Sequence, residues 1–438
     1  MRCATTAIIQ LESSDLLQFP SDAVASPCPV ARFADLTLSS AFQPIFSLAH
    51  RRSIGYEALL RARDPAGNDV PPLAVFGRSF APGRWSNLER GVQLMHASNF
   101  TKIATPEDLL FLNTRPDGFI VSQPYRRLVE DTLKRLHLAP DHIVLEVLET
   151  PNANVQRLVE GIAAFRQQGF LIALDDFGAG HSNIDRIWQL QPDIVKLDRS
   201  VIEHAGLNAP VARLLPRLVS LLHEAGALVL VEGVETQHEA LLAMESEADF
   251  AQGFYFARPA PGRGDEVGYR ATMDSLWQLF RARNRERARA EASLLSGYTA
   301  AVQRAAERIA AGTDFTLACE DFLRLEGAAR CFLLDAQGEQ IGREIMATRW
   351  CGSSSNLFRA IVDASGSCWE RRPYFRNAIG MPGKVQITQP YLSINGRHLC
   401  VTFSVAIRVK DAVWILCADG DWGQTTRNSD AGRAVSQD

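Results

Sequence analysis

Short apolar runs recur along the first part of the chain and are separated by longer amphipathic stretches. The runs themselves show no regular alternation with polar residues. Such runs are typical of strands that are covered on both faces, as in a parallel sheet flanked by helices. The pattern therefore predicts eight strands, at Phe42–Leu48, Gly55–Leu60, Leu109–Leu112, Ile143–Leu148, Leu171–Leu174, Ile194–Leu197, Leu228–Val231 and Phe250–Phe256.

The segments between the runs have the periodicity of helices. Residues 155–168 are the clearest example, because their apolar residues share one helical face and Gly169 follows as a stop signal. Eight strands that alternate with helices over about 230 residues fit a (β/α)8 barrel of the TIM type. The sequence thus places this part of the chain in the α/β class.

The composition changes after the last run. From about residue 264 to residue 312, Ala, Arg and Glu dominate and proline is absent, which predicts one long helix or two. Residues 281–289 within this stretch are strongly basic. They suit either a contact to phosphate or a solvated helix face, and the solvated face is the simpler interpretation.

The last part of the chain has the features of a separate α+β domain. Alternating apolar residues predict strands at Cys331–Asp335, Val385–Leu392, His398–Val409 and Val413–Ala418. Asn395-Gly396 is typical of a hairpin turn between the second and the third of these strands. We therefore expect a flexible tail at 1–30, the barrel at 31–262, a helical connector at 263–312, the α+β domain at 313–425 and a tail at 426–438.

The chain has 438 residues, with 46 Lys and Arg against 50 Asp and Glu, a net charge of −4. This balance offers no overall attraction for nucleic-acid polymers or anionic membranes. No apolar run approaches the roughly 18 residues of a membrane span, and the N-terminus lacks the pattern of a secretory signal. The eight cysteines form no CxxC pair, and none lies between Cys28 and Cys319. We therefore predict a cytoplasmic protein with free thiols and no zinc site.

Polar side chains stand at or just after the ends of these apolar strands. They are Glu57, Asn113, Glu146, Asp175, Asp176, Lys196, Asp198, Glu232 and Gln252. A charged residue in a buried strand is costly unless it is paired or binds a metal. In a barrel of this type the carboxyl ends of the strands converge on one mouth, where active sites are found. For any single residue a buried salt bridge is an equal explanation, but the whole set predicts one functional site.

The predicted site is rich in carboxylate and amide oxygens and receives no histidine from the strand ends. Several carboxylates cannot ionise together without cations between them. Ligand sets made only of oxygen suit hard ions such as Mg²⁺ or Mn²⁺. Adjacent Asp175 and Asp176 can bridge two ions roughly 3.5–4 Å apart, a spacing that activates water against phosphodiesters. Lys196 can orient that water or neutralise charge that develops on phosphate.

The polar residues stand in an ordered series of motifs between residues 38 and 262. The series is Phe42-Gln43-Pro44-Ile45, Tyr56-Glu57-Ala58-Leu59-Leu60-Arg61, Asn113, Glu146-Val147-Leu148-Glu149, Asp175-Asp176-Phe177-Gly178-Ala179-Gly180-His181-Ser182, Lys196-Leu197-Asp198, Glu232-Gly233-Val234-Glu235-Thr236 and Gln252-Gly253-Phe254-Tyr255-Phe256. This series resembles the EAL-domain cyclic di-GMP phosphodiesterases, and it is highly specific as a whole. The resemblance implies hydrolysis of cyclic di-GMP to linear pGpG with two Mg²⁺ or Mn²⁺ ions.

The resemblance also implies a role for each matched residue. The first metal would be held by Glu57, Asn113, Glu146 and Asp175, and the second by Asp175, Asp176 and Glu232. Catalysis would involve Lys196 and Gln252, which place the attacking water, together with the ligands Glu57 and Glu232. Substrate contacts would come from Arg61, which grips a phosphate, and from Gln43, Leu60, Asp176, Phe256 and Pro259.

A further group of matched residues would support the site. The resemblance implies that residues 176–182, with Gly178 and Ser182, form a mobile loop linked to metal binding and dimerisation. Glu149 would anchor this loop. Asp198 and Glu235 would support the ligands from behind.

The C-terminal part resembles, more loosely, the sensory domains of the Cache/PAS group. The supporting segments are Trp369-Glu370-Arg371-Arg372-Pro373-Tyr374-Phe375-Arg376, Gln389-Pro390-Tyr391 and Ala418-Asp419-Gly420. Aromatic residues beside arginines can close a pocket around a small ligand of unknown identity. A packed domain that supports a homodimer is a nearly equal interpretation.

The sequence therefore predicts an active, dimeric cyclic di-GMP phosphodiesterase that is regulated by its C-terminal domain. The alternative is a barrel that binds cyclic di-GMP, hardly cleaves it and signals through a partner protein. The complete set of matched metal ligands favours the enzyme.

Overall fold

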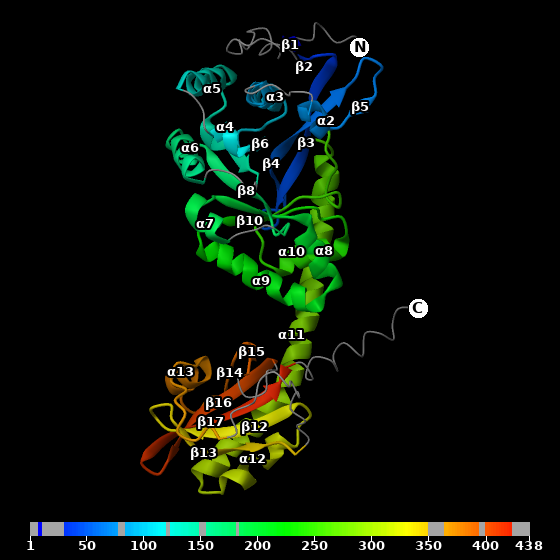
Figure 1. The fold of residues 1–438 in the computed structure, drawn as a ribbon. Helices are drawn as coiled ribbons and strands as arrows, with labels where there is room; N and C mark the ends of the chain where they lie inside the picture. Colours follow the sequence, from blue (N-terminus) through cyan, green and yellow to red (C-terminus); the bar gives the residue numbers. More distant parts are fainter. Residues whose placement is uncertain are drawn as a thin grey trace. The chain divides into compact units, whose positions relative to one another are not determined.

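The computed structural model describes residues 8–10, 30–77, 84–119, 123–148, 155–180, 184–348, 363–393 and 399–422. The chain divides into two compact units, residues 1–281 and residues 282–438, which are described in turn (Figure 1). Each unit has its own buried apolar core.

The first unit is built on a closed barrel of eight strands. The strands are β3 Leu36–Ser47, β4 Arg52–Arg63, β6 Leu109–Thr114, β7 Ile143–Val147, β8 Leu171–Phe177, β9 Ile194–Leu197, β10 Leu228–Val231 and β11 Phe250–Ala251. They pair in the order β3-β11-β10-β9-β8-β7-β6-β4, and the pairing of β4 with β3 closes the ring. The predicted eight-stranded α/β barrel is therefore confirmed.

The first strand of the barrel, β3, is antiparallel to its neighbours. The simple alternation of strands and helices did not predict this direction. β3 is antiparallel to both β4 and β11, whereas β4 and β6 to β11 pair in parallel. Only residues 48–51 separate β3 from β4. A parallel crossover needs a dozen or more residues, so this short connection can form only a hairpin.

Helices surround the barrel. They are α2 Pro72–Gly77, α3 Arg84–Phe100, α4 Pro116–Phe119, α5 Gln123–Leu136, η1 Pro140–His142, α6 Val155–Gln167, α7 Ile184–Leu190, α8 Arg199–Leu207, α9 Ala209–Glu224 and α10 Gln237–Glu245. The predicted amphipathic helix at 155–168 is confirmed as α6, which buries Leu158, Ile162 and Phe165. The main apolar core of this unit contains these helix residues and residues of the strands.

A separate apolar layer fills the inside of the barrel. It consists of Ile45, Phe111, Val144, Ala173, Ile194 and Leu230, each from a different strand. Because side chains two residues apart on a strand point to the same face, the next inward positions of β6 to β10 stand directly above this layer. The apolar layer thus forms the floor on which the polar strand ends stand.

Three further strands extend the sheet beside the barrel. β1 Ile8–Gln10 pairs in parallel with β2 Val30–Phe33, β2 pairs with β3, and β5 Asp69–Val70 pairs with β4. β1 lies within the segment that the sequence predicts as a tail. Three residues are too few to show a recognisable alternation, so the sequence gives no signal for this strand.

One long helix, α11 Glu266–Ala310, follows the barrel and confirms the helix predicted there. Met273 and Leu276 of this helix belong to the core of the first unit, and Trp277 Nε1 donates a 2.8 Å hydrogen bond to the Leu48 carbonyl. Val302 and Ile309 belong to the core of the second unit. The helix therefore contributes to both cores rather than only linking them.

The second unit is an antiparallel sheet with helices on both faces. Its strands are β12 Ala328–Leu334, β13 Gln340–Met346, β14 Gln386–Ile387, β15 Tyr391–Leu392, β16 Leu399–Val409 and β17 Ala412–Asp421. They are ordered β13-β12-β17-β16-β14, and β15 also pairs with β16. The end of α11 and helix α12 Phe315–Leu323 pack on one face, and helix α13 Pro373–Gly380 packs on the other. The predicted turn Asn395-Gly396 lies outside the described residues.

No helix within the described ranges combines the length and the apolar character that crossing a bilayer requires.

A buried histidine joins α3 to the barrel. His96 is 3% exposed, and its Nδ1 lies 2.7 Å from Ser40 Oγ on β3. Asn99 Nδ2 donates to the same oxygen at 2.9 Å, so Ser40 joins two residues of α3. Burial, together with the nearby charge of Arg61, lowers the pKa of His96 to about 3. The imidazole is therefore neutral in the folded protein.

This neutral histidine should make the barrel sensitive to mild acid. In the unfolded chain His96 binds a proton below about pH 6.5, whereas in the folded protein it remains neutral down to about pH 3. At this residue the unfolded state therefore gains its proton first, and the contribution of His96 lowers stability as the pH drops below 6.5. We expect His96 to account for a loss of about 2 kcal/mol between pH 7.5 and pH 5.

Urea unfolding at these two pH values measures the effect. The variant His96→Gln should lose correspondingly less stability than the wild type over the same interval, whatever its stability at pH 7.5. An equal loss in both proteins would contradict the assigned role of His96.

Candidate metal centre and active site

The polar strand ends meet at the mouth of the barrel. Asn113, Glu146, Asp175, Lys196 and Glu232 each stand two residues beyond a member of the apolar floor. Asn113 and Glu146 are also direct neighbours across the β6–β7 pair. The regular two-residue repeat of strands thus brings side chains from five neighbouring strands to one place.

Lys196 lies at the centre of this group. Its Nζ is 2.6 Å from Glu146 Oε1, 2.7 Å from Glu232 Oε1 and 3.0 Å from Asp175 Oδ1. The side chain of Lys196 is 1% exposed and that of Glu146 is fully buried. One ammonium therefore neutralises part of the charge of three carboxylates from three different strands.

A bulge at the end of β8 orients two adjacent aspartates toward the same space. Neighbouring residues on a regular strand point to opposite faces. The pairing of β8 with β9 shifts register between Leu174 and Phe177, and Asp176 has a φ of 55°. This left-handed conformation is rare for a residue with a side chain, although aspartate tolerates it better than most. The bulge explains how both Asp175 and Asp176 can serve one site.

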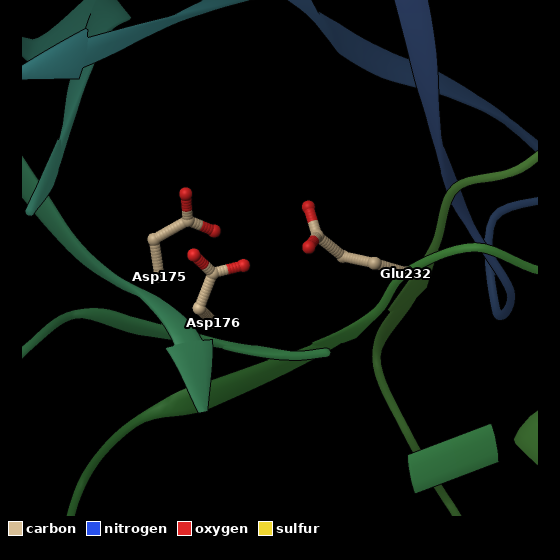
Figure 2. Close-up of side chains that lie close together, drawn as sticks. All are labelled: Asp175, Asp176 and Glu232. Atoms are coloured by element: carbon tan, nitrogen blue, oxygen red, sulfur yellow. The ribbon is translucent and has the colours of Figure 1, made fainter. Parts of the chain in front are cut away.

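Asp175, Asp176 and Glu232 form a cluster of the size that holds a metal ion. One carboxylate oxygen from each lies within 4.8 Å of the others. Figure 2 shows the carboxyl groups of Asp175 and Asp176 at the end of β8 and that of Glu232 facing them from the end of β10. These three residues are the set that the sequence resemblance assigns to the second metal.

Glu57 is held in place by two amides. Asn113 Nδ2 donates to Glu57 Oε1 at 3.0 Å, and Gln252 Nε2 donates to Glu57 Oε2 at 2.8 Å. Gln252 comes from the end of β11, next to β3 in the ring. The carboxylate of Glu57 also acts electrostatically on Glu146, Lys196 and Glu232. It therefore belongs to the same group of charges.

The crowding of carboxylates changes their proton affinities. Burial, together with the charges of Glu57 and Asp175, raises the pKa of Glu146 well above its usual range despite the opposing effect of Lys196. The same causes raise the pKa of Glu232 to about 8. Burial works against the charge of Lys196, but the surrounding carboxylates outweigh it and raise its pKa. The site holds more negative charge than one lysine can balance.

The donor atoms fit hard divalent cations. All of the candidate ligands offer oxygen, from carboxylates and from the amide of Asn113. Among the described residues, the buried atoms Glu146 Oε2 and Gln252 Oε1 have no hydrogen-bond partner. A buried oxygen without a partner is costly, and a bound cation or its water ligands would satisfy it. Asp175, Asp176 and Glu232 are thus able to hold a metal ion, and Glu57, Asn113 and Glu146 place further oxygen atoms among the same group of charges.

The other predicted substrate contacts come from the strands and loops near Glu57 and Gln252 in the sequence or the sheet. Gln43 stands opposite Glu57 on β3, and its Nε2 donates to the Ala257 carbonyl at 3.2 Å. Arg61 is exposed on β4, four residues after Glu57. Phe256 is buried and packs against other aromatic rings, and Pro259 is partly exposed on the loop that follows β11.

Leu60 does not join this group. Strand alternation turns it to the face of β4 opposite Glu57, where it packs in the core beside α3. A leucine three residues after a ligand on a strand cannot share the ligand's face.

The structure describes three of the five residues that were predicted to support the site. Asp198 accepts a hydrogen bond from the Ser200 amide and caps α8, Glu235 pairs with Arg199, and Gly178 follows the β8 bulge with a φ of 104°. Glu149 and Ser182 lie outside the described residues.

The sequence did not identify Gln93 of α3 as part of the site's framework. Its Nε2 donates to the Asn113 carbonyl and to Thr114 Oγ1, both at 3.0 Å. These bonds fix the backbone of the strand end that carries Asn113. Gln93 stands within a helix outside every recognisable motif, so no local signal marks it.

Comparison with known proteins identifies the first unit. A family model described as the EAL domain matches residues 31–259, just over half of the chain. The cyclic di-GMP phosphodiesterase RocR of Pseudomonas aeruginosa is 28% identical over 230 residues, which are 50% of this chain and 57% of RocR. The Escherichia coli protein named "Probable cyclic di-GMP phosphodiesterase PdeN" is 28% identical over 226 residues, 50% of this chain and 43% of PdeN. The chain thus spans about half the length of these curated relatives.

A solved structure extends the likeness to most of the chain. The Bacillus subtilis YkuI protein, described as having an EAL domain and solved in complex with its substrate c-di-GMP and calcium, superposes with a TM-score of 0.75. The match covers 88% of this chain and 96% of the YkuI chain at 19% identity. At this identity the likeness establishes a shared fold.

The central lysine should stabilise the metal-free protein strongly. Replacing Lys196 by Met removes the cation from three carboxylates, of which Glu146 is fully buried. Breaking such a buried pair costs about 3–5 kcal/mol of unfolding free energy. Added Mn²⁺ should recover part of this loss, because the cation neutralises the same carboxylates.

Urea unfolding in EDTA and in Mn²⁺ measures both effects. Lys134→Met, at an exposed position on α5, is the matched control and should change stability little. A Lys196→Met protein as stable as the wild type in EDTA would contradict the assigned role.

Proposed function

The chain belongs to the EAL-domain family, and from this membership we propose that it hydrolyses cyclic di-GMP to linear pGpG. The observation that carries the proposal is the cluster of Asp175, Asp176 and Glu232 beside the buried Lys196. Metal ions held by such carboxylates would activate water against a phosphodiester bond, with a cationic group beside them. The names of RocR and PdeN, and the substrate bound to YkuI, agree with this reaction.

We propose that two Mg²⁺ or Mn²⁺ ions complete the site. Glu57, Asn113, Glu146 and Asp175 would hold one ion, and Asp175, Asp176 and Glu232 the other. When bound, such ions would lower the pKa of a water molecule and neutralise charge on the phosphate. The oxygen-only ligand set and the partnerless oxygens of Glu146 and Gln252 support this assignment.

The protein's own side chains would then orient the reaction. Lys196 would keep its proton at Nζ, and it would donate a hydrogen bond to the attacking water once one of its three carboxylate partners binds a metal ion instead. Gln252 holds Glu57 through its amide nitrogen, and its free Oε1 accepts a hydrogen bond from the same water. Arg61 binds a phosphate oxygen of the substrate at the exposed rim. The remaining substrate contacts would be Gln43, Asp176, Phe256 and Pro259.

The loop that follows β8 would couple metal binding to assembly. Residues 176–182, anchored by Glu149, carry Asp176 at one end and Gly178 and Ser182 further along. Asp198 and Glu235 would hold the neighbouring strand ends in place. We propose a cytoplasmic homodimer in which this loop has that role.

We propose that the second unit is a Cache/PAS-like sensory domain that regulates the barrel. Its antiparallel sheet with α13 on one face suits such a domain. Aromatic and arginine side chains gather on that face, where the Arg372 guanidinium lies 5.7 Å from the ring centre of Tyr391. A small ligand of unknown identity would bind there.

A hydrolysis assay with purified protein tests the activity directly. Cyclic di-GMP should be converted to pGpG in Mg²⁺ or Mn²⁺ and not in EDTA. Glu57→Ala and Lys196→Ala should each lower kcat by about 100-fold or more, because each removes a group that acts on the metal ion or the water. Product analysis by chromatography gives the rates.

Matched surface variants control for general effects. Glu224→Ala and Lys134→Ala remove exposed groups of the same types from α9 and α5 and should leave the rate unchanged. Substrate that binds tightly but remains intact with the wild type would instead support a receptor that signals through a partner. Near-normal rates for Glu57→Ala and Lys196→Ala would contradict the catalytic roles.

Removal of the second unit tests the regulatory proposal. A chain that ends at Arg281 keeps Trp277 and the core contacts of the first unit. If the second unit regulates the barrel, its turnover should differ from that of the full chain by about fivefold or more. Circular dichroism would verify that the shortened chain is folded. Equal kcat and KM values for the two proteins would contradict regulation under those conditions.

A further inference from the structure

Side chains in the first turn of α8 pack directly against the backbone of two glycines, Gly178 and Gly233. At Gly178 an added Cβ would lie 2.3 Å from Val201 Cγ2. At Gly233 it would lie 2.5 Å from both Cβ and Cγ of Arg199. Both glycines have positive φ, 104° and 64°, so the backbone conformation and the close contact each favour glycine. The side chains of Arg199 and Val201 occupy the space that the glycines leave.

The two glycines flank the candidate metal ligands. Gly178 stands two residues after Asp176, and Gly233 directly follows Glu232. Asp175 and Asp176 come from the end of β8, whereas Glu232 comes from the end of β10. The first turn of α8 therefore touches the backbone of both segments that supply the carboxylate cluster.

The turn itself is fixed between these two segments. The Asp198 amide donates to the Phe177 carbonyl at 3.0 Å, and the Glu232 amide donates to the Leu197 carbonyl at 3.0 Å. Asp198 also caps α8 by accepting a 3.0 Å hydrogen bond from the Ser200 amide. The end of β9 thus bonds to the end of β8 through the Asp198 amide. It bonds to the segment after β10 through the Leu197 carbonyl.

An ion pair adds to this contact on the outer side. Arg199 Nη1 lies 2.7 Å from Glu235 Oε1, and Arg199 Nε lies 2.5 Å from Glu203 Oε1. The side chain of Arg199 is 50% exposed, and exposed ion pairs contribute little to stability. The hydrocarbon stem of Arg199 against Gly233 is therefore the stronger part of the contact.

We propose that Arg199 and Val201 are positioning residues that set the distance between Glu232 and the pair Asp175 and Asp176. Metal ions demand ligand distances within a few tenths of an ångström, so residues that hold the ligand backbones control metal affinity. Val201 restrains the aspartate segment through Gly178, and Arg199 restrains the glutamate through Gly233. This inference rests on the proposed metal-dependent function.

Calorimetric titration of Mn²⁺ into the substrate-free full-length protein tests the proposal. Val201→Ala removes the methyl groups over Gly178, and Arg199→Ala removes the stem over Gly233. Each should weaken Mn²⁺ binding by about tenfold, the range found when supporting contacts of metal ligands are lost. The electron paramagnetic resonance spectrum of bound Mn²⁺ should also change in these variants, because the ligand geometry changes.

Two matched variants separate packing from charge. Arg199→Met keeps a long stem without the ion pairs and should bind Mn²⁺ within about twofold of the wild type. Arg324→Ala removes an exposed arginine that pairs with Glu320 at the end of α12 in the second unit. This control should not change Mn²⁺ affinity. Thermal unfolding of each variant shows that it is folded.

The outcomes distinguish this inference from the proposed function. Wild-type protein that binds no Mn²⁺ would overturn both. Wild-type binding with unchanged affinity and spectra in Arg199→Ala and Val201→Ala would overturn the positioning role alone. Loss of affinity in Arg199→Met equal to that in Arg199→Ala would overturn the assignment to the stem.

Discussion

The ammonium of Lys196 lies within 3.0 Å of carboxylate oxygens from Glu146, Asp175 and Glu232, deep in the mouth of the barrel. Without a cation at this position the carboxylates could not be buried together, because like charges repel strongly where water is excluded. Lys196 alone does not balance them, since the pKa of Glu146 remains raised. The residual negative charge is what a divalent cation would neutralise. The same electrostatic imbalance thus limits the stability of the metal-free barrel and, under the proposed function, would provide the affinity for metal.

The apolar floor makes this concentration of charge possible. Residues such as Val144 and Ala173 fill the barrel, and the strand repeat places Glu146 and Asp175 two residues further on. These strands therefore orient the charged side chains, because their neighbouring inward residues are packed in the apolar layer. Asp176 depends on an irregular feature, the bulge with its left-handed backbone, and Glu232 is followed by Gly233, which also has a positive φ. A site built on regular strands keeps its geometry with little additional support, whereas the bulge needs contacts from its neighbours.

The sequence predicted the barrel and the position of its polar strand ends because both follow from short-range periodicity. The direction of β3 was missed, although the short connection between β3 and β4 excludes a parallel crossover. Gln93 of α3 and Arg199 of α8 were not recognised, since each acts on a backbone from another part of the chain. Leu60 was grouped with Arg61 by motif, but strand alternation turns it into the core. Local pattern predicts which residues share a face, whereas contacts between elements require the fold.

The net charge of −4 describes the local field at the mouth poorly. Five acidic residues, Glu57, Glu146, Asp175, Asp176 and Glu232, surround a single lysine there, and a substrate that carries two phosphates would be repelled by such a surface. The repulsion is removed only if cations occupy the site before or together with the substrate. Under the proposed function, Arg61, which is exposed on β4, would add a positive group for the substrate. An acidic chain is therefore compatible with an anionic dinucleotide, provided that metal binding precedes or accompanies recognition and reverses the sign of the local charge.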